Sequence, residues 1–148
     1  MLAPVTEEEK SGERAARVTS SVVFVSDLGR SVGFYRDLFS CEVTLEEASA
    51  ALLLAPGAFQ IYLIACGERA PHSSRGIGLQ YLIWAVDSAT ELNDLERAIR
   101  ARGSRTYRHT SGDITFLTSR DPDGIRIVVA HPSPEKRPRV LVDNRLYA

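Results

Sequence analysis

The feature that most constrains this fold is that the chain runs twice through the same order of secondary-structure signals. A β-branched segment that ends at Val25 is followed by a helical pattern and three short apolar segments, and the same order restarts with a segment that ends at Val86, 61 residues later. Self-similarity at a fixed spacing indicates a duplicated supersecondary unit. We therefore predict two copies of one β-α-β-β-β module.

In the first copy, a strand is predicted over residues 18–25 and Asp27 is a candidate N-cap. The helix after it has apolar residues at helical spacing, and Pro56-Gly57 marks a turn between its last two strands. The apolar helix positions are Leu28, Val32, Tyr35 and Leu38 or Phe39, and the strands that follow are expected near 42–46, 50–55 and 59–65.

In the second copy, a strand is predicted over 79–86, and Ser88 with Glu91 has the spacing of a capping box. Gly103 ends the helix, and the segment 121–124 (Asp-Pro-Asp-Gly) is a tight turn, because the fixed φ of proline suits the second position of a turn. The helix shows Leu92, Leu95 and Ile99 on one side, and strands are expected near 104–109, 114–119 and 125–130.

The two modules are expected to form one domain. Both ends of the chain lack regular apolar periodicity, and the stretch after His131 is rich in proline. The C-terminal residues Val140–Val142, Leu146 and Tyr147 are nevertheless apolar, so they dock on the body or on a partner chain, or they fray. The expected parts are an N-terminal tail (1–17), the first module (18–66), a linker (67–78), the second module (79–131) and a C-terminal tail (132–148).

Composition excludes several function classes. The chain has 18 basic and 19 acidic residues, so its net charge of −1 does not favour nucleic acid or anionic membranes as partners. No apolar run approaches the roughly 20 residues of a membrane span, and we expect a cytoplasmic protein. Cys41 and Cys66 have no metal-site spacing and are interpreted as small, buried apolar side chains.

Two segments carry a resemblance to a known superfamily. Residues 25–35 (VSDLGRSVGFY) open the first helix, and residues 121–127 (DPDGIRI) lead into the last strand of the second module. Together with the duplicated module, they resemble the vicinal oxygen chelate superfamily, which includes glyoxalase I, bleomycin and fosfomycin resistance proteins and extradiol dioxygenases. The resemblance implies an α+β fold in which two tandem βαβββ modules form a concave mixed sheet.

Enzymes of that superfamily hold a metal ion on the first and last strands of each module. By the resemblance, these positions fall on Ser20, Tyr62, Tyr81 and Val128. Divalent metals need histidine, cysteine or carboxylate ligands in sufficient number, and this set offers none. A shift of one residue would substitute Gln80, but two further ligands would still be missing. We therefore expect no metal and no cofactor.

The three histidines do not restore a metal site. His72 lies in the polar linker, His109 ends a predicted strand, and His131 follows the last strand. We interpret each as an exposed or locally hydrogen-bonded imidazole. No residue is assigned a catalytic role.

Alternation along the strands predicts the side chains that line the concave face. The former ligand positions and their neighbours two residues away would face the cup, whereas Trp84 and the other alternate residues would pack under the helices. The mixture of aromatic side chains with a few polar groups suits a flat, partly aromatic ligand, and Arg126 suits an acidic group. The candidate ligand-binding residues are Ser20, Phe24, Gln60, Tyr62, Tyr81, Ile83, Arg126 and Val128.

Two function classes remain open. The first is a metal-free small-molecule binding protein that sequesters an antibiotic or an aromatic metabolite in an apolar cup, and the resemblance implies a homodimer. The alternative is an enzyme on the same cup, either a metal-independent lyase, isomerase or cyclase, or a glyoxalase or dioxygenase with displaced metal ligands. Bleomycin-type ligands are cationic, and the predicted cup contains no acidic cluster.

Overall fold

The computed structural model describes residues 17–68, 77–136 and 146. The predicted N-terminal tail lies outside these residues except Arg17, as does most of the predicted linker. Of the predicted C-terminal tail, the described part is residues 132–136 and Leu146. No helix within the described ranges has the length and hydropathy needed to cross a membrane.

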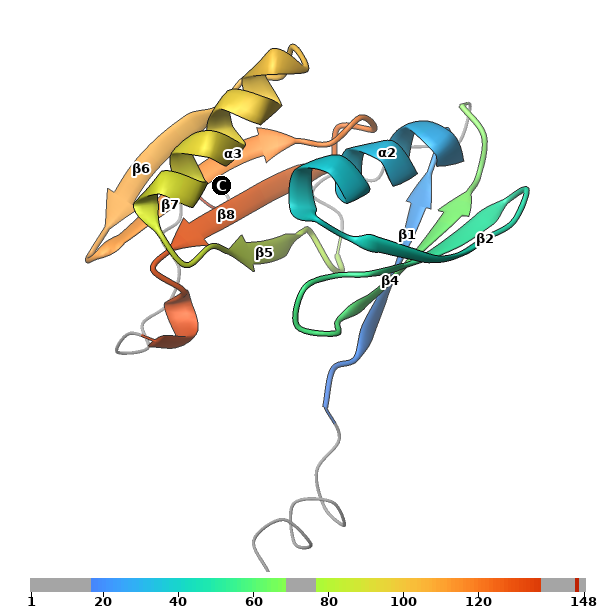
Figure 1. The fold of residues 1–148 in the computed structure, drawn as a ribbon, viewed down its shortest axis with the longest axis horizontal. Coiled ribbons are helices and arrows are strands. Elements are labelled where there is room, and N and C mark those ends of the chain that lie inside the picture. The colour runs from blue at the N-terminus through green and yellow to red at the C-terminus, as the bar shows by residue number, and fades with distance from the viewer. Residues whose placement is uncertain (1–16, 69–76, 137–145, 147–148) are drawn as a thin grey trace, which may run out of the picture.

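Both halves of the chain have the predicted β-α-β-β-β order (Figure 1). The first module contains β1 (Ser20–Val25), α2 (Leu28–Phe39), β2 (Glu42–Glu46), β3 (Ala50–Leu54) and β4 (Gln60–Ala65). The second contains β5 (Leu82–Ala85), α3 (Ala89–Ala101), β6 (Tyr107–Ser111), β7 (Ile114–Arg120) and β8 (Arg126–His131), followed by the short helix η1 (Pro134–Lys136).

The two sheets have the same strand order, which confirms the internal repeat. The first sheet is ordered β1-β4-β3-β2 and the second β5-β8-β7-β6, with the first strand of each module parallel to the last. The other pairs are antiparallel. Figure 1 shows the modules side by side, and α2 and α3 are in contact. The fold is α+β with two tandem modules, as the resemblance implied.

Local capping explains where both helices begin. The side chain of Asp27 accepts a hydrogen bond from the backbone N–H of Arg30 at 2.9 Å, and that of Ser88 accepts one from Glu91 at 3.1 Å. The Glu91 carboxylate accepts the N–H of Asp87 at 3.0 Å, one residue before the cap, rather than that of the cap residue itself. Both predicted helix starts are confirmed.

One core joins the helix-facing sides of both sheets. It contains alternate residues of the strands, such as Ile61 and Leu63 on β4 and Ile127 and Val129 on β8. Trp84 packs against this core, with its ring centre 4.2 Å from that of Phe39 on α2. The predicted alternation of faces is therefore observed, and the opposite sides of the sheets are left to form binding surfaces.

Candidate functional site

The outer face of the second sheet carries a small apolar pocket that is filled by Leu146. The side chain of Leu146 is fully buried and packs with Phe116, Val128 and Ala130. Tyr81 and Ile114 pack against the same cluster from its edge. We call this group the Leu146 pocket. The sequence left open whether the C-terminal residues dock or fray, and the structure shows Leu146 docked.

Two polar side chains converge on the backbone oxygen of Leu146. Arg126 donates from Nη1 to this oxygen at 2.5 Å, and Tyr81 donates from its hydroxyl to the same atom. The guanidinium group of Arg126 also lies over the Tyr81 ring, 5.5 Å from its centre. We call Tyr81 and Arg126 the anchor pair. Their arrangement forms a binding position for an oxygen acceptor, and charge on the acceptor would strengthen both bonds.

A basic cavity of about 640 Å³ continues from Arg126 across the same sheet. Its walls come from β6, β7, β8 and the residues before β6, and Arg126 is shared with the anchor pair. The lining residues are Ser104, Arg105, Tyr107, Arg108, His109, Thr118, Ser119, Arg120, Asp121 and Arg126. The lining contains four arginines and one aspartate, and this excess of positive charge favours the binding of anions.

Besides Arg126, two of these arginines have partners in the protein. Arg108 pairs with Glu96 at 2.8 Å and donates to Asn93, while Arg120 donates to the backbone oxygen of Gly124 at 2.8 Å. A hydrogen bond to a neutral carbonyl leaves the charge of Arg120 uncompensated, whereas Arg108 is neutralised by its carboxylate. Arg126 and Arg120 are therefore the stronger candidates for holding an anion in the basic cavity.

His109 is a potential functional residue to which the sequence analysis assigned no role. Its ring stacks on Phe116 with 5.3 Å between centres, and it lines the basic cavity. Within the described part of the chain, its buried Nε2 atom has no hydrogen-bond partner. The expectation of an exposed or locally bonded imidazole is therefore wrong for His109, because β6 begins at Tyr107 and places this residue in mid-strand. For His131 it is right, since Nδ1 lies 3.0 Å from the oxygen of Val86.

The other predicted residues divide between two further places. Ser20 and Tyr62 both donate to the side-chain oxygen of Gln60, at 3.2 and 3.3 Å, and form a polar group on the first sheet. Phe24 lines a cavity of about 260 Å³ between the modules, together with Tyr81 and Arg126.

Ile83 remains partly exposed on β5, where it pairs in register with Val128. Val128 itself is fully buried beneath Leu146. Within the described residues the structure thus brings Tyr81, Arg126 and Val128 together around Leu146, and places Phe24 beside them.

The residues at the superfamily's metal-ligand positions do not fit a metal ion. Val128 carries no donor atom, the Tyr81 hydroxyl is engaged by Leu146, and Ser20 and Tyr62 donate to Gln60. Neutral hydroxyl groups that act as donors cannot replace histidine or carboxylate ligands. Among residues 17–68, 77–136 and 146, no three side chains of His, Cys, Asp or Glu are placed to hold a metal.

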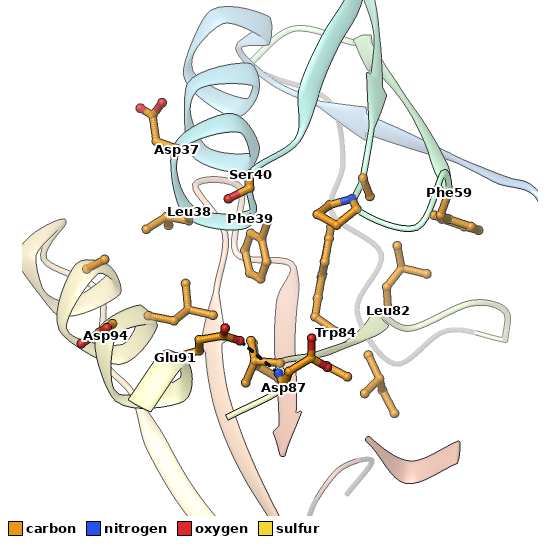
Figure 2. A pocket seen from close by; sticks show the side chains of 18 of the residues that line it. Asp37, Leu38, Phe39, Ser40, Phe59, Leu82, Trp84, Asp87, Glu91 and Asp94 are labelled. Carbon is orange, nitrogen blue, oxygen red and sulfur yellow. Dashed lines mark hydrogen bonds between the residues drawn. The ribbon is translucent and has the colours of Figure 1, made fainter. Parts of the chain in front are cut away.

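A larger cavity lies on the helix side, away from the anchor pair. It has a volume of about 960 Å³ and opens between the end of α2, the start of α3 and β5 (Figure 2). Phe39 and Trp84 line it, and Asp37, Glu91 and Asp94 are at its edge. All three carboxylates have partners. Asp37 pairs with Arg36 and Arg102, Glu91 accepts the N–H of Asp87, and Asp94 pairs with Arg97. This cavity is therefore a groove between the helices whose acidic groups are already satisfied.

The Asp-Pro-Asp-Gly turn does more than reverse the chain. Asp121 accepts a hydrogen bond from the hydroxyl of Tyr35 on α2 at 2.8 Å, and Asp123 accepts the N–H of Ser26 at 3.1 Å. Burial raises the pKa of the Asp121 carboxyl. Burial and the nearby Asp121 carboxylate also raise the pKa of the Tyr35 hydroxyl. Both segments that carried the resemblance thus join the two modules.

Comparison with known proteins supports the fold. No protein-family model and no curated protein sequence matches the chain. Among solved structures, a glyoxylase/bleomycin resistance protein/dioxygenase domain from Frankia sp. EAN1pec is 22% identical, with a TM-score of 0.68 over 78% of this chain and 97% of that one.

Two others extend the comparison. The fosfomycin resistance protein FosX from Listeria monocytogenes is 16% identical, with a TM-score of 0.68 over 84% of this chain and 99% of that one. A lactoylglutathione lyase from Agrobacterium tumefaciens is 17% identical, with a TM-score of 0.62 over 79% of this chain and 94% of that one. The chain therefore has the fold of the vicinal oxygen chelate superfamily, as its sequence resemblance indicated.

Proposed function

We propose that this protein binds an anionic small molecule, an antibiotic or a metabolite, on the outer face of its second module without a metal ion. One observation carries the proposal: Tyr81 and Arg126 both donate to a single oxygen atom, that of Leu146. A pair of donors that converges on one point recognises a carboxylate, phosphonate or similar oxygen. The adjacent Leu146 pocket would hold the apolar part of the same molecule.

The charges around the anchor pair favour an anion over a cation. Arg120 and Arg126 line the basic cavity, and Asp121, the acidic residue there, already accepts hydrogen bonds from Tyr35 and the backbone. A cationic ligand would place its charge beside two guanidinium groups, which is unfavourable in a partly buried site. Bleomycin-type ligands are therefore disfavoured, and anionic antibiotics or carboxylated metabolites are preferred.

We also propose that the protein is a homodimer. The outer face of the first sheet carries exposed apolar side chains, because Val22, Phe24 and Leu45 are 61%, 67% and 64% exposed. An exposed apolar group of this kind is typical of an interaction surface, and a second copy of the chain is the proposed occupant. Sedimentation equilibrium should give twice the monomer mass. A monomer at micromolar concentration would contradict the dimer.

A metal-independent lyase or isomerase is the second candidate function. The observation that favours it is the buried Nε2 atom of His109, which has no hydrogen-bond partner among the described residues and whose side chain lines the basic cavity together with Arg126. An imidazole nitrogen in such a place can accept or donate a proton to a bound molecule, while Arg126 stabilises negative charge. Turnover of a bound compound that is lost in His109→Gln, with its binding retained, would support this function.

The experiment that tests the binding function compares acids with their amides. Benzoate and benzamide, and 4-methylpentanoate and its amide, differ in charge but hardly in shape. Fosfomycin, named by one structural neighbour, extends the set to another anion. We expect the acids to raise the melting temperature and to bind in calorimetry, and the amides to bind at least tenfold more weakly. Arg126→Gln should lower the affinity for the acids about tenfold or more, as for the loss of a charge-assisted hydrogen bond.

Arg97→Gln provides the matched control. Arg97 lies on the exposed side of α3 and pairs with Asp94, so its replacement changes the net charge equally without touching the anchor pair. Equal binding of acids and amides, or equal losses in the Arg126 and Arg97 variants, would contradict the proposed function.

A further inference from the structure

We propose that Leu146 is a displaceable internal occupant of the binding site, and that the external ligand that replaces it carries a compact branched aliphatic group beside a carboxylate. This inference rests on the proposed function, because it concerns the same anchor pair. It adds to that function a ligand shape and a built-in competitor, both taken from the residue that occupies the site.

The apolar half of the ligand is defined by the pocket that holds the Leu146 side chain. Its isobutyl group is fully buried against Phe116, Val128 and Ala130, with Ile114 and Tyr81 at the edge. Phe116 and Val128 supply the walls, while the small side chain of Ala130 leaves room for a branched group. A ligand of the same shape would make the same contacts.

The polar half is defined by the oxygen of Leu146. A backbone carbonyl is neutral, but both of its partners are side-chain donors and one of them, Arg126, carries a full positive charge. A carboxylate at the same position would form charge-assisted bonds with both donors, which are about twice as strong as neutral ones. The anchor pair is therefore better matched to an anionic oxygen than to the carbonyl that it now binds.

Leu146 can leave without opening the main core. Among the described residues, its cluster consists of Leu146 and three other buried residues, and it is separate from the larger core that joins both helices and both sheets. The two clusters lie on opposite faces of β8, since Val128 and Ala130 alternate with Ile127 and Val129. Departure of Leu146 would uncover Val128, Ala130 and Phe116, and it would leave the helix-facing core intact.

An internal occupant lowers the apparent affinity of any external ligand by the fraction of molecules in which the site is open. If Leu146 occupies the site most of the time, its removal must strengthen external binding. A permanent structural role for Leu146 predicts the reverse, because the pocket would then collapse or unfold when the side chain is lost.

The experiment uses the full chain and 4-methylpentanoate, which reproduces the leucine side chain with a carboxylate in place of the peptide carbonyl. Binding is measured by calorimetry or by ligand-observed NMR in the wild type, Leu146→Lys and Leu146→Ala. Lysine places a second positive charge beside Arg126 and should expel residue 146 from the pocket. Alanine makes fewer apolar contacts in the pocket and adds no charge. Ile77→Lys is the matched control, since Ile77 is fully exposed.

We expect 4-methylpentanoate to bind Leu146→Lys at least tenfold more tightly than the wild type, Leu146→Ala by a smaller factor, and Ile77→Lys unchanged. Addition of Arg126→Gln to Leu146→Lys should remove most of this gain. If 4-methylpentanoate binds the wild type and both Leu146 variants with equal affinity, and binds Arg126→Gln more weakly, Leu146 is not an internal competitor. The proposed binding function would be unaffected by that result.

Two further outcomes also decide the question. If Leu146→Lys fails to fold and folded Leu146→Ala binds no more tightly than the wild type, Leu146 is a fixed part of the structure and the inference is wrong. If 4-methylpentanoate binds none of the proteins, the inferred ligand shape is wrong. In that case the comparison of other acids with their amides still decides the proposed function independently.

Discussion

The guanidinium carbon of Arg126 lies 5.5 Å from the centre of the Tyr81 ring. The two residues are far apart in the sequence, and the structure brings them together because β5 and β8 are parallel neighbours. Stacking on Tyr81 limits the conformations of a long side chain, so less entropy is lost when Arg126 binds an anion. Tyr81 thus has two expected roles, as a donor and as a support for the charged group.

The two roles of Tyr81 can be separated by substitution. Tyr81→Phe keeps the ring under Arg126 and removes the hydroxyl that donates to the site, so we expect anion binding to weaken about tenfold or more, the scale of a hydrogen bond to a charged group. Tyr81→Ala removes both functions and should weaken binding more than Tyr81→Phe does, by up to about 3 kcal/mol of binding free energy. Calorimetry with a bound carboxylate checks both values. Wild-type affinity in Tyr81→Ala would exclude Tyr81 from the site.

Trp84 should give the opposite result. It faces the helices, and its ring lies 4.2 Å from that of Phe39 and 6.2 Å from that of Tyr35. We expect Trp84→Ala to lower the free energy of unfolding by roughly 3 to 5 kcal/mol, as for other large aromatic core residues, with little direct effect on ligand contacts. Urea denaturation measures the first quantity. Unchanged stability together with lost binding would show that the two faces are assigned the wrong way round.

The pH dependence of stability should depend on Asp121. Burial raises the pKa of its carboxyl above the ordinary value of 3.8, although hydrogen bonds from Tyr35 and the backbone oppose this rise. The folded protein then holds the proton more tightly than the unfolded chain does. The contribution of Asp121 to stability is therefore fully present below pH 3.8 and is lost as the pH rises through the folded-state pKa.

Asp121→Asn removes this titration while keeping an oxygen acceptor for the backbone. We expect the unfolding free energy of the wild type, relative to that of Asp121→Asn, to fall as the pH is raised from about 4 toward neutrality. Parallel urea denaturation curves over this range provide the measurement. A difference that stays constant, or that grows with pH, would show that the Asp121 pKa is not raised.

The two cysteines should differ in reactivity. Cys41 is buried, and burial raises the pKa of its thiol to about 11, whereas Cys66 is exposed. Because the thiolate is the reactive form, an alkylating reagent at neutral pH should label Cys66 alone in the folded protein, and both residues after denaturation. Mass spectrometry of digested protein locates the label. Rapid native labelling of Cys41 would contradict its burial in the core.

The sequence predicted the parts of the fold that depend on local patterns. Asp27 and Ser88 begin the helices as expected, since capping is decided by residues three positions apart. The alternation along β4 and β8 likewise predicted that Ile61 and Ile127 face the main core, and that Tyr62 and Val128 face the opposite side of their sheets. The expectation of a buried side chain is confirmed for Cys41 and wrong for Cys66, which is exposed because it lies directly after β4, outside the alternation of the strand.

The candidate site depended on contacts that local patterns do not contain. The predicted strand over 79–86 is shorter in the structure, so Tyr81 precedes β5 and is positioned by packing rather than by strand alternation. The contact between Leu146 and Val128 joins the C-terminal tail to β8, and an apolar residue in a tail after a proline-rich stretch gives no indication of its partner. The position of His109 depended on where β6 begins, which is a matter of pairing with β7.

The most direct test of the account is the position of a bound acid on the second sheet. Intermolecular nuclear Overhauser effects between the methyl groups of 4-methylpentanoate and the protein would report that position in Leu146→Ala. The account predicts contacts to the methyl groups of Val128 and Ala130 and to the Phe116 ring, the residues that surround Leu146 in the structure. Contacts to Trp84 and Phe39 in the groove between the helices, without contacts to Val128, would contradict it.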